Sequence, residues 1–400
     1  MEKQGHGYFP DDCWELIFQK LREDDERDLG SISLVSKRFL LISNWVKQSL
    51  NVNAKKRHLL SNHLSRFRHI KSIVICFDKK KYVDGLVNQI AWSGVLNLQD
   101  IWFQCSTEPP RDCFKALALN KIINNYLKVL DCSGLCSMQD KDLVLIADLF
   151  PRIEELWLRT DAYIYKDAAA RMTDDGVDVL ASKLMELKEI VFTGYTCSIT
   201  DQSLISLSTN CAKLRKISLC IYSSCQHYVT EDGIDFVVQH SPNLTSLSLE
   251  LWSLQHSASF FAIGNALANA KNLHSLTMTQ ELISDKRIWL VAKACTPLRK
   301  LKIVDFGGQY PEIHGGLKFL LHACELTLEE ITLRNWALSN LGISDLAQYL
   351  SNLTSIDLDG HFGLTSVTFY TLTMSCPLLE ILTMACARGR DRYFFSRSHI

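Results

Sequence analysis

The residue type best suited to chemistry in this sequence is cysteine, which occurs fourteen times. Thiols bind metals in closely spaced pairs, act as nucleophiles beside a histidine, or form disulfides. No Cys-x-x-Cys pair occurs, and the nearest pairs, Cys132/Cys136 and Cys220/Cys225, have no second pair at zinc spacing. Phosphate-loop, serine-hydrolase and metalloprotease motifs are also absent from the sequence. We therefore expect no catalytic residues, no metal and no cofactor.

Charge and hydropathy exclude two further classes of protein. The 400 residues contain 43 basic and 44 acidic side chains, so the net charge of −1 argues against nucleic-acid binding through bulk charge. No stretch reaches the ~18 uninterrupted apolar residues that a membrane span requires. Residues 1–10 contain no apolar run, so we expect no secretory signal. These features predict an intracellular protein of the nucleus or cytoplasm, with reduced and mostly buried thiols.

A repeat fills most of the chain, and it determines the expected architecture. The pattern apolar-x-x-apolar-x-apolar recurs at intervals of 25 to 34 residues. Its twelve copies begin at Ile70, Leu98, Leu127, Ile153, Leu187, Leu214, Leu244, Leu273, Leu298, Leu328, Leu353 and Leu379. This regular recurrence predicts a stack of about twelve similar units.

Each repeat reads as one short strand and one helix. In the copy that begins at Leu244, Leu247 and Leu249 point to one face of a strand and Ser248 points to the other. The preceding stretch has apolar residues at helical spacing after Thr230, which can cap a helix. A single strand and helix cannot bury their own apolar faces, so the units must stack into a continuous core. The prediction is an α/β solenoid with a ladder of parallel strands and helices outside it.

The repeats resemble leucine-rich repeats, specifically the subclass that contains cysteine. The segments 199–201 (Ile-Thr-Asp) and 229–234 (Val-Thr-Glu-Asp-Gly-Ile) match the helix start of that subclass. Four cysteines fall at its helix-end position: Cys211, Cys295, Cys324 and Cys376. The resemblance implies that these thiols are packed inside rather than catalytic.

The first fifty residues follow a different pattern, with three short helices expected between residues 8 and 50. Trp14, Ile17, Phe18 and Leu21 share one helical face. The strings 9–21 (FPDDCWELIFQKL) and 34–39 (LVSKRF) resemble an F-box, with Phe9 in place of the usual leucine. Its position ahead of leucine-rich repeats is typical of plant substrate receptors of SCF-type ubiquitin ligases. In that family the F-box binds a Skp-family adaptor, the adaptor binds a cullin, and the repeats hold the target protein.

The resemblance implies a set of adaptor-binding residues in this segment: Phe9, Pro10, Trp14, Ile17, Leu21, Leu34, Val35 and Phe39. The alternative is that these side chains form an ordinary small helical core. Sequence alone does not divide them between the core and the adaptor groove. A unit of this size buries little surface by itself, so we expect it to depend on the repeats and on a partner.

A basic segment follows the F-box-like region. Residues 29–77 contain no Asp or Glu and nine Lys or Arg. One interpretation is an electropositive shoulder that meets an acidic partner, and Skp-family adaptors are generally acidic. The alternatives are a solvated face, or a nuclear address at residues 55–57 (Lys-Lys-Arg).

Target-binding residues are expected on the concave face of the strands and along one rim. Among the slots between the last two apolar positions, Trp102 and Trp157 are the large aromatic residues. An exposed indole suits a partner contact, although each ring could instead pack on a neighbour. Arg159 follows on the same face, and residues 161–171 form an insertion near the rim. A slot three residues beyond the strand apolar residues holds aromatics that pack in the turn or line the rim: Tyr195, Tyr222, Trp252, Phe306 and Trp336.

The sequence therefore predicts a non-catalytic substrate-recognition subunit of an SCF-type ubiquitin ligase. Its expected parts are an F-box at 8–50, a basic linker or solenoid cap at 51–69, repeats at 70–387 and a disordered basic tail at 388–400. The expected partners are a Skp-family adaptor, a cullin reached through it, and an unknown target protein. The alternative is a leucine-rich-repeat scaffold outside any ligase, whose N-terminal helices only cap the array.

Overall fold

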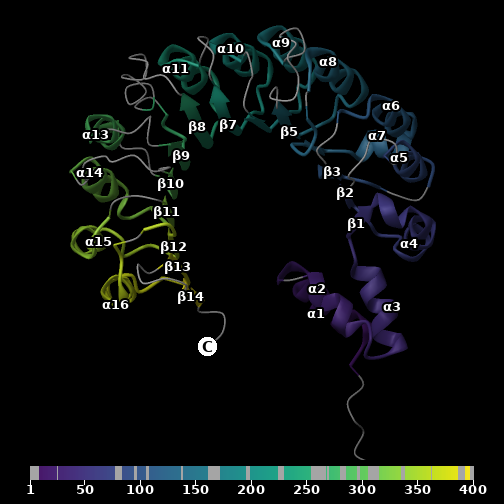
Figure 1. Cartoon of the computed structure of the whole chain (residues 1–400), viewed down its shortest axis with the longest axis horizontal. Coiled ribbons are helices and arrows are strands. Elements are labelled where there is room, and N and C mark those ends of the chain that lie inside the picture. Colours follow the sequence, from purple (N-terminus) through teal and green to yellow (C-terminus); the bar gives the residue numbers. More distant parts are fainter. Residues whose placement is uncertain are drawn as a thin grey trace, which may run out of the picture. The chain divides into compact units, whose positions relative to one another are not determined.

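The computed structural model of the chain forms two compact units. The first comprises residues 1–136 and 148–155, and the second comprises residues 137–147 and 156–400. The structure describes residues 9–24, 26–76, 83–93, 97–104, 108–136, 138–160, 172–194, 199–223, 229–253, 267, 270–279, 285–294, 298–304, 315–334, 338–361, 363–385 and 392–396. Helices cover one face of the strands in each unit (Figure 1).

The first unit begins with three helices: α1 (Asp11–Asp24), α2 (Glu26–Ile32) and α3 (Lys37–Val46). Asp11 and Asp12 lie in the first turn of α1, where carboxylates favour a helix start. The Ser36 hydroxyl caps α3 by accepting a hydrogen bond from the Phe39 amide at 3.1 Å. The helices pack around a small core, whose buried members are Phe18, Leu29, Ile42 and Val46.

Strands and further helices complete the first unit. Its strands are β1 (Ser49–Asn53), β2 (Ser72–Cys76), β3 (Asp100–Gln104) and β4 (Val129–Cys132). Its other helices are η1 (Ala54–Leu59), α4 (Leu60–Arg66), α5 (Val83–Ala91), α6 (Arg111–Leu119) and α7 (Lys121–Tyr126). The strands lie in chain order and pair in parallel, with Ser49 opposite Ser72 and Ser72 opposite Asp100.

The second unit continues the same pattern. Its strands are β5 (Glu155–Thr160), β6 (Glu189–Gly194), β7 (Lys216–Ser223), β8 (Ser246–Ser253), β9 (Ser275–Thr279), β10 (Lys300–Val304), β11 (Glu330–Arg334), β12 (Ser355–Leu358), β13 (Ile381–Ala385) and β14 (Arg392–Ser396). Its helices are α9 (Asp174–Lys183), α10 (Asp201–Asn210), α11 (Glu231–His240), α13 (Asp285–Ala294), α14 (Gly315–Cys324), α15 (Asn340–Ala347) and α16 (Ser366–Ser375), and α8 (Asp140–Leu149) precedes β5.

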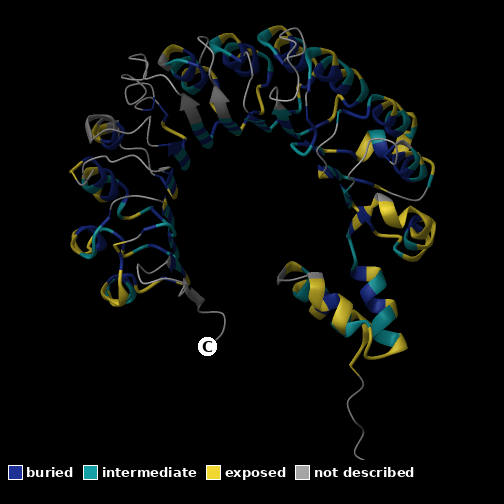
Figure 2. Cartoon of the chain, in the orientation of Figure 1, coloured by how far each residue is buried: buried dark blue, intermediate teal, exposed yellow. Residues whose placement is uncertain are grey.

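The apolar positions of all twelve sequence repeats are buried, and the repeats correspond to β2 through β13. Figure 2 shows this burial along the strands and the inner helix faces. The structure is therefore the α/β leucine-rich-repeat solenoid that the sequence predicts.

The strand ladder extends beyond the predicted repeats at both ends. Residues 51–69, expected as a linker or cap, form most of β1 together with η1 and α4, and β1 joins the parallel ladder. At the other end, the tail expected to be disordered contributes β14, which pairs antiparallel with β13. Neither strand carries the full repeat motif, so the repeat search could not find them.

Carboxylates at the helix starts join one repeat to the next in the second unit. The Asp201 carboxylate accepts hydrogen bonds from both the amide and the hydroxyl of Thr230, each at 2.6 Å. Asp140 accepts the same two bonds from Thr173 at 2.7 Å. The Thr230 hydroxyl also accepts from the Asp232 amide at 3.2 Å, so one side chain caps its own helix and contacts the neighbouring helix.

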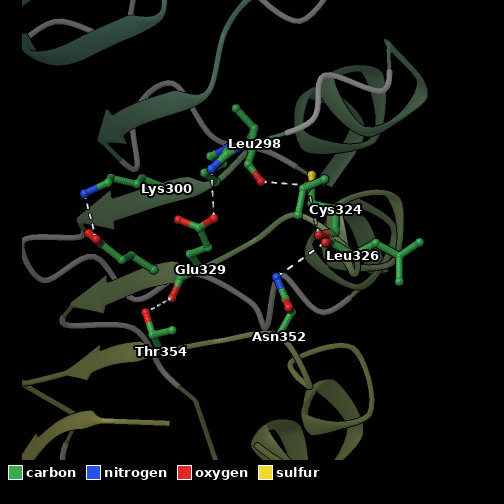
Figure 3. Close-up of polar contacts among 10 residues, drawn as sticks. Leu298, Lys300, Cys324, Leu326, Glu329, Asn352 and Thr354 are labelled. Carbon is green, nitrogen blue, oxygen red and sulfur yellow. Dashed lines mark hydrogen bonds and ion pairs between the residues drawn. The ribbon is translucent and has the colours of Figure 1, made fainter. Parts of the chain in front are cut away.

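Polar contacts also join neighbouring strands. Figure 3 shows the region around β10 to β12, where the Thr354 hydroxyl donates to the Glu329 carbonyl at 3.0 Å. The Lys300 ammonium pairs with Glu330 of the next strand at 2.6 Å. Such exposed pairs contribute little stability each, but matched charges favour the observed register.

Candidate protein-binding surfaces

The turn between α2 and α3 exposes two large apolar side chains. Leu34 is 86% exposed and Val35 is 70% exposed. Backbone hydrogen bonds from Leu34 to Ser31 and from Val35 to Ile32 hold this turn, at 3.2 and 3.0 Å. Because adjacent large apolar residues are rarely left in water without a use, the turn is a candidate contact with another protein.

Arg38 brings the chain start to the same end of the three-helix unit. Its guanidinium donates to the Phe9 carbonyl at 2.5 Å and to the Asp11 carboxylate at 2.6 Å. These contacts place Phe9 and Pro10, both exposed, beside the start of α3 and therefore beside the turn with Leu34 and Val35. We name Phe9, Pro10, Leu34 and Val35 the apolar end.

Three residues of the predicted adaptor set contribute to packing inside the unit. Trp14, Leu21 and Phe39 are partly buried against the core. The ring centroids of Trp14 and Phe39 lie 4.7 Å apart, and those of Phe39 and Phe18 lie 5.2 Å apart. Each side chain keeps part of its surface exposed, so adaptor contact by these three residues stays a prediction.

Ile17 of the predicted set is exposed, and so are two apolar side chains outside that set, Leu16 and Leu41. Leu16 lies two positions before the buried Phe18, and Leu41 lies one position before the buried Ile42. Residues one or two positions away from a buried one point about 100° or 200° around the helix, away from the apolar stripe. Their position outside the apolar face of each helix was the sequence signal that could have identified Leu16 and Leu41 as exposed.

On the strand face, Trp102 of β3 is half-buried and lies in register with Asp131 of β4. Asp131 is buried, and burial raises the pKa of its carboxyl group; the hydrogen bond from the Ser133 amide at 2.6 Å opposes that shift. Trp102 thus presents part of a rigid aromatic ring to solvent, beside the Asp131 carboxyl group, whose pKa is raised.

Trp157 of β5 is also half-buried, and its indole nitrogen is covered. The Lys216 ammonium of β7 lies 5.9 Å from the ring centroid and pairs with Glu189 at 2.6 Å. The ring therefore has a cationic neighbour within its own unit. Arg159, two residues along the strand, is half-buried as well.

The other cations on this face have carboxylate partners. The Lys302 ammonium binds Glu250 at 2.8 Å, and the Arg334 guanidinium donates twice to Asp357, at 2.9 and 2.5 Å. Its hydrogen bond to Asp357 raises the pKa of the Arg334 guanidinium above its ordinary value. These charges are already paired, so this part of the face offers polar contacts rather than a free cationic site.

Only part of the predicted aromatic rim falls within the described residues. Tyr195, Phe306 and Trp336 and the insertion at 161–171 lie outside the described residues. Tyr222 and Trp252 lie opposite each other in β7 and β8. The rim prediction therefore stays a prediction.

The sequence did not single out Trp92, which is 75% exposed after the end of α5. The Asn120 amide donates to the Ala91 carbonyl at 2.6 Å and closes the C-terminal end of that helix.

Within the described residues, no helix has the length and apolarity that crossing a membrane requires. The same residues contain no metal-binding cluster of His, Cys, Asp or Glu.

Comparison with a solved structure supports the fold described above. No protein-family model matches the chain. Yeast Rad7, from the crystal structure of the Rad7 and Elc1 complex, superposes with a TM-score of 0.51 at 14% identity, over 92% of this chain and 87% of that one. The fold is thus that of a leucine-rich-repeat solenoid preceded by a small helical unit.

A curated relative is described as a plant F-box protein. The Arabidopsis thaliana protein described as "Putative F-box protein At4g11580" is 24% identical over 212 residues. The match covers 50% of this chain and 61% of the relative's length. The chain is therefore similar to a plant F-box protein, as its sequence motifs suggest.

Proposed function

We propose that the chain is a non-catalytic substrate-recognition subunit of an SCF-type ubiquitin ligase, acting inside the cell in the nucleus or cytoplasm. In this role the unit at residues 8–50 binds a Skp-family adaptor, which links it to a cullin. The strand face of the repeats holds the protein to be ubiquitinated. The proposal requires no cofactor.

The observation that carries the proposal is the apolar end of the three-helix unit. The unit packs Trp14, Phe18 and Phe39 in or against its own core but leaves Leu34 and Val35 in water. A unit this small gains stability by covering such residues with a partner. The similarity to a plant F-box protein supports an adaptor as that partner, and yeast Rad7, which has a similar fold, is known in complex with Elc1.

For target binding we propose two strand surfaces, one around Trp102 in the first unit and one around Trp157 and Arg159 in the second. Aromatic rings supply large contact areas and lose little side-chain entropy on binding. Both rings are half-buried, so each offers part of its surface. The aromatic residues Tyr195, Tyr222, Trp252, Phe306 and Trp336 remain the proposed rim of the second surface.

The deciding experiment is co-purification of the full chain with a Skp-family adaptor. Replacing both Leu34 and Val35 by Asp places charge where the adaptor would bury apolar groups, which costs several kcal/mol. We expect the double variant to lose the adaptor while keeping the wild-type melting temperature, because both side chains are exposed. Leu21 is unsuitable for this test because it packs on the core, so its replacement would also unfold the unit.

The matched control is Leu326→Asp, since Leu326 is 87% exposed in the turn after α14. It should retain the adaptor. Wild-type adaptor binding by the Leu34/Val35 variant would contradict the proposal. The alternative, a repeat scaffold outside any ligase, would then apply.

A further inference from the structure

A second surface lies at the opposite end of α3, where the chain enters the repeats. Here the end of α3 and the following Lys47 pack against the end of α4 and the residues after it. The rings of Trp45 and His69 lie with their centroids 4.0 Å apart. The Arg66 guanidinium donates to the Asn44 side-chain oxygen at 2.9 Å. Both contacts join positions more than twenty residues apart in the chain, so the surface has a defined geometry.

Phe67 lies between two cations on this surface. The Lys47 ammonium is 5.7 Å from its ring centroid, and the Arg66 guanidinium is 5.0 Å away. Backbone bonds from Lys71 and Ser72 to the Gln48 carbonyl, at 2.8 and 3.0 Å, hold the two chain segments together. We name the resulting surface the basic–aromatic face, formed by Trp45, Lys47, Arg66, Phe67, Arg68 and His69.

The face is open to solvent, and its own chain segment carries no acidic side chain. Trp45, Arg66, Arg68 and His69 are exposed (Figure 2 shows α4 largely in the exposed colour). Residues 29–77, which include the whole face, contain no Asp or Glu. Lys71 is left out of the face because it already faces the half-buried Asp100 of β3.

We propose that the basic–aromatic face docks an acidic segment of a partner protein. Guanidinium groups form paired hydrogen bonds with carboxylates, and exposed Trp45 can cover the apolar parts of the same segment. A short acidic peptide fits the few cations on this face better than a nucleic acid does. The chain's net charge of −1 also provides no long-range attraction for a polyanion.

This surface is separate from the apolar end and goes beyond the proposed function. α3 has 10 residues, so its two ends lie about 15 Å apart. The apolar end lies at the start of α3, and Trp45 and Lys47 lie at its end. A partner held at the basic–aromatic face can therefore bind whether or not the apolar end is occupied.

The test is fluorescence anisotropy of a labelled Glu- and Asp-rich peptide against the full chain. The double variant Lys47→Glu/Arg68→Glu should weaken binding about tenfold or more, since charge-assisted hydrogen bonds are lost. Trp45→Ala should weaken it as well, and Trp45→Phe should retain most of it. The variant Arg152→Glu/Lys271→Glu makes the same change in net charge at exposed turns elsewhere and should bind like the wild type.

Three results would overturn this proposal. Equal weakening by the two double variants would mean that the peptide senses only net charge. Tighter binding of a single-stranded oligonucleotide of equal charge would assign the face to nucleic acid. Loss of the Skp-family adaptor by the Lys47/Arg68 variant at unchanged melting temperature would assign the face to the adaptor. Intact adaptor binding beside lost peptide binding separates this proposal from the ligase role.

Discussion

Three residues form the contact that joins neighbouring repeats: an aspartate, a threonine and a glycine. The Asp201 carboxylate rests against the start of α11, where it accepts both hydrogen bonds from Thr230. A Cβ atom on Gly233 would lie 2.1 Å from that carboxylate oxygen, and one on Gly176 would lie 2.2 Å from Asp140. In the intervening repeat Ser203 takes the glycine position, and its hydroxyl donates to the Asp174 carboxylate, as does its amide at 3.1 Å. The position thus selects either no side chain or one that donates to the carboxylate.

We expect Gly233→Ala to destabilise the protein by about 1–2 kcal/mol in urea denaturation. Displacing the carboxylate loses hydrogen bonds to a charged group, which exceeds the ~1 kcal/mol that alanine gains in a helix. In an Asp201→Ala background the same change should be neutral or stabilising, because nothing remains to clash. The control is Gly30→Ala in α2, which has open space around it and should not destabilise. Equal losses in both backgrounds would contradict this mechanism.

At the scale of elements, the predicted helix-end cysteine Cys211 packs against the end of the preceding helix, whereas Cys295 lies outside the described residues. The Cys211 thiol lies 3.7 Å from the Ala181 carbonyl and 3.6 Å from the Leu184 carbonyl, at the end of α9. The Leu184 carbonyl also accepts from the Leu187 amide, so the single weak S–H donor can serve the Ala181 carbonyl without adding a charge. Burial raises the pKa of Cys211 to about 12 and that of Cys376 to about 11.

We expect Cys211 to resist iodoacetamide in the folded protein at pH 8. A pKa near 12 leaves about one thiol in ten thousand ionised, and the thiolate is the reactive form. Because the folded state favours the protonated thiol, its contribution to folding stability falls as the pH rises above the ordinary value of 9.0. Mass spectrometry after a short alkylation pulse measures the effect, with urea-unfolded protein as the control. Labelling of folded Cys211 as fast as the half-buried Cys13 would contradict it.

The twelve repeat strands were predictable from sequence because each carries three apolar residues at fixed spacing, and all of them are buried. The division of the N-terminal helices was not predictable. Trp14 and Leu34 are equally apolar in sequence, yet the first contacts Phe39 and the second lies in a tight turn. β1 and β14 were missed because strand pairing with a neighbour, rather than their own sequence, defines them.

At the scale of the whole molecule, repeats contact mainly their neighbours, so damage to one should spread along the chain. Leu247 in β8 is buried, and Leu247→Ala should cost about 2–5 kcal/mol through the cavity it leaves. Hydrogen exchange should rise most in β7 and β9, which pair with β8, and less in strands farther away. The exposed Leu326→Ala should change stability by less than ~0.5 kcal/mol. A uniform rise in exchange across both compact units would contradict this picture.

The reversed direction of β14 has a consequence for self-assembly. A ladder made only of parallel strands would expose edges of matching polarity at its first and last strands, and such edges allow copies to add head to tail. β14 runs antiparallel to β13, so the last edge no longer has the polarity that β1 would continue. Within the described residues, one short strand of opposite direction thus ends the parallel ladder with an edge that a second copy of β1 would not extend in parallel.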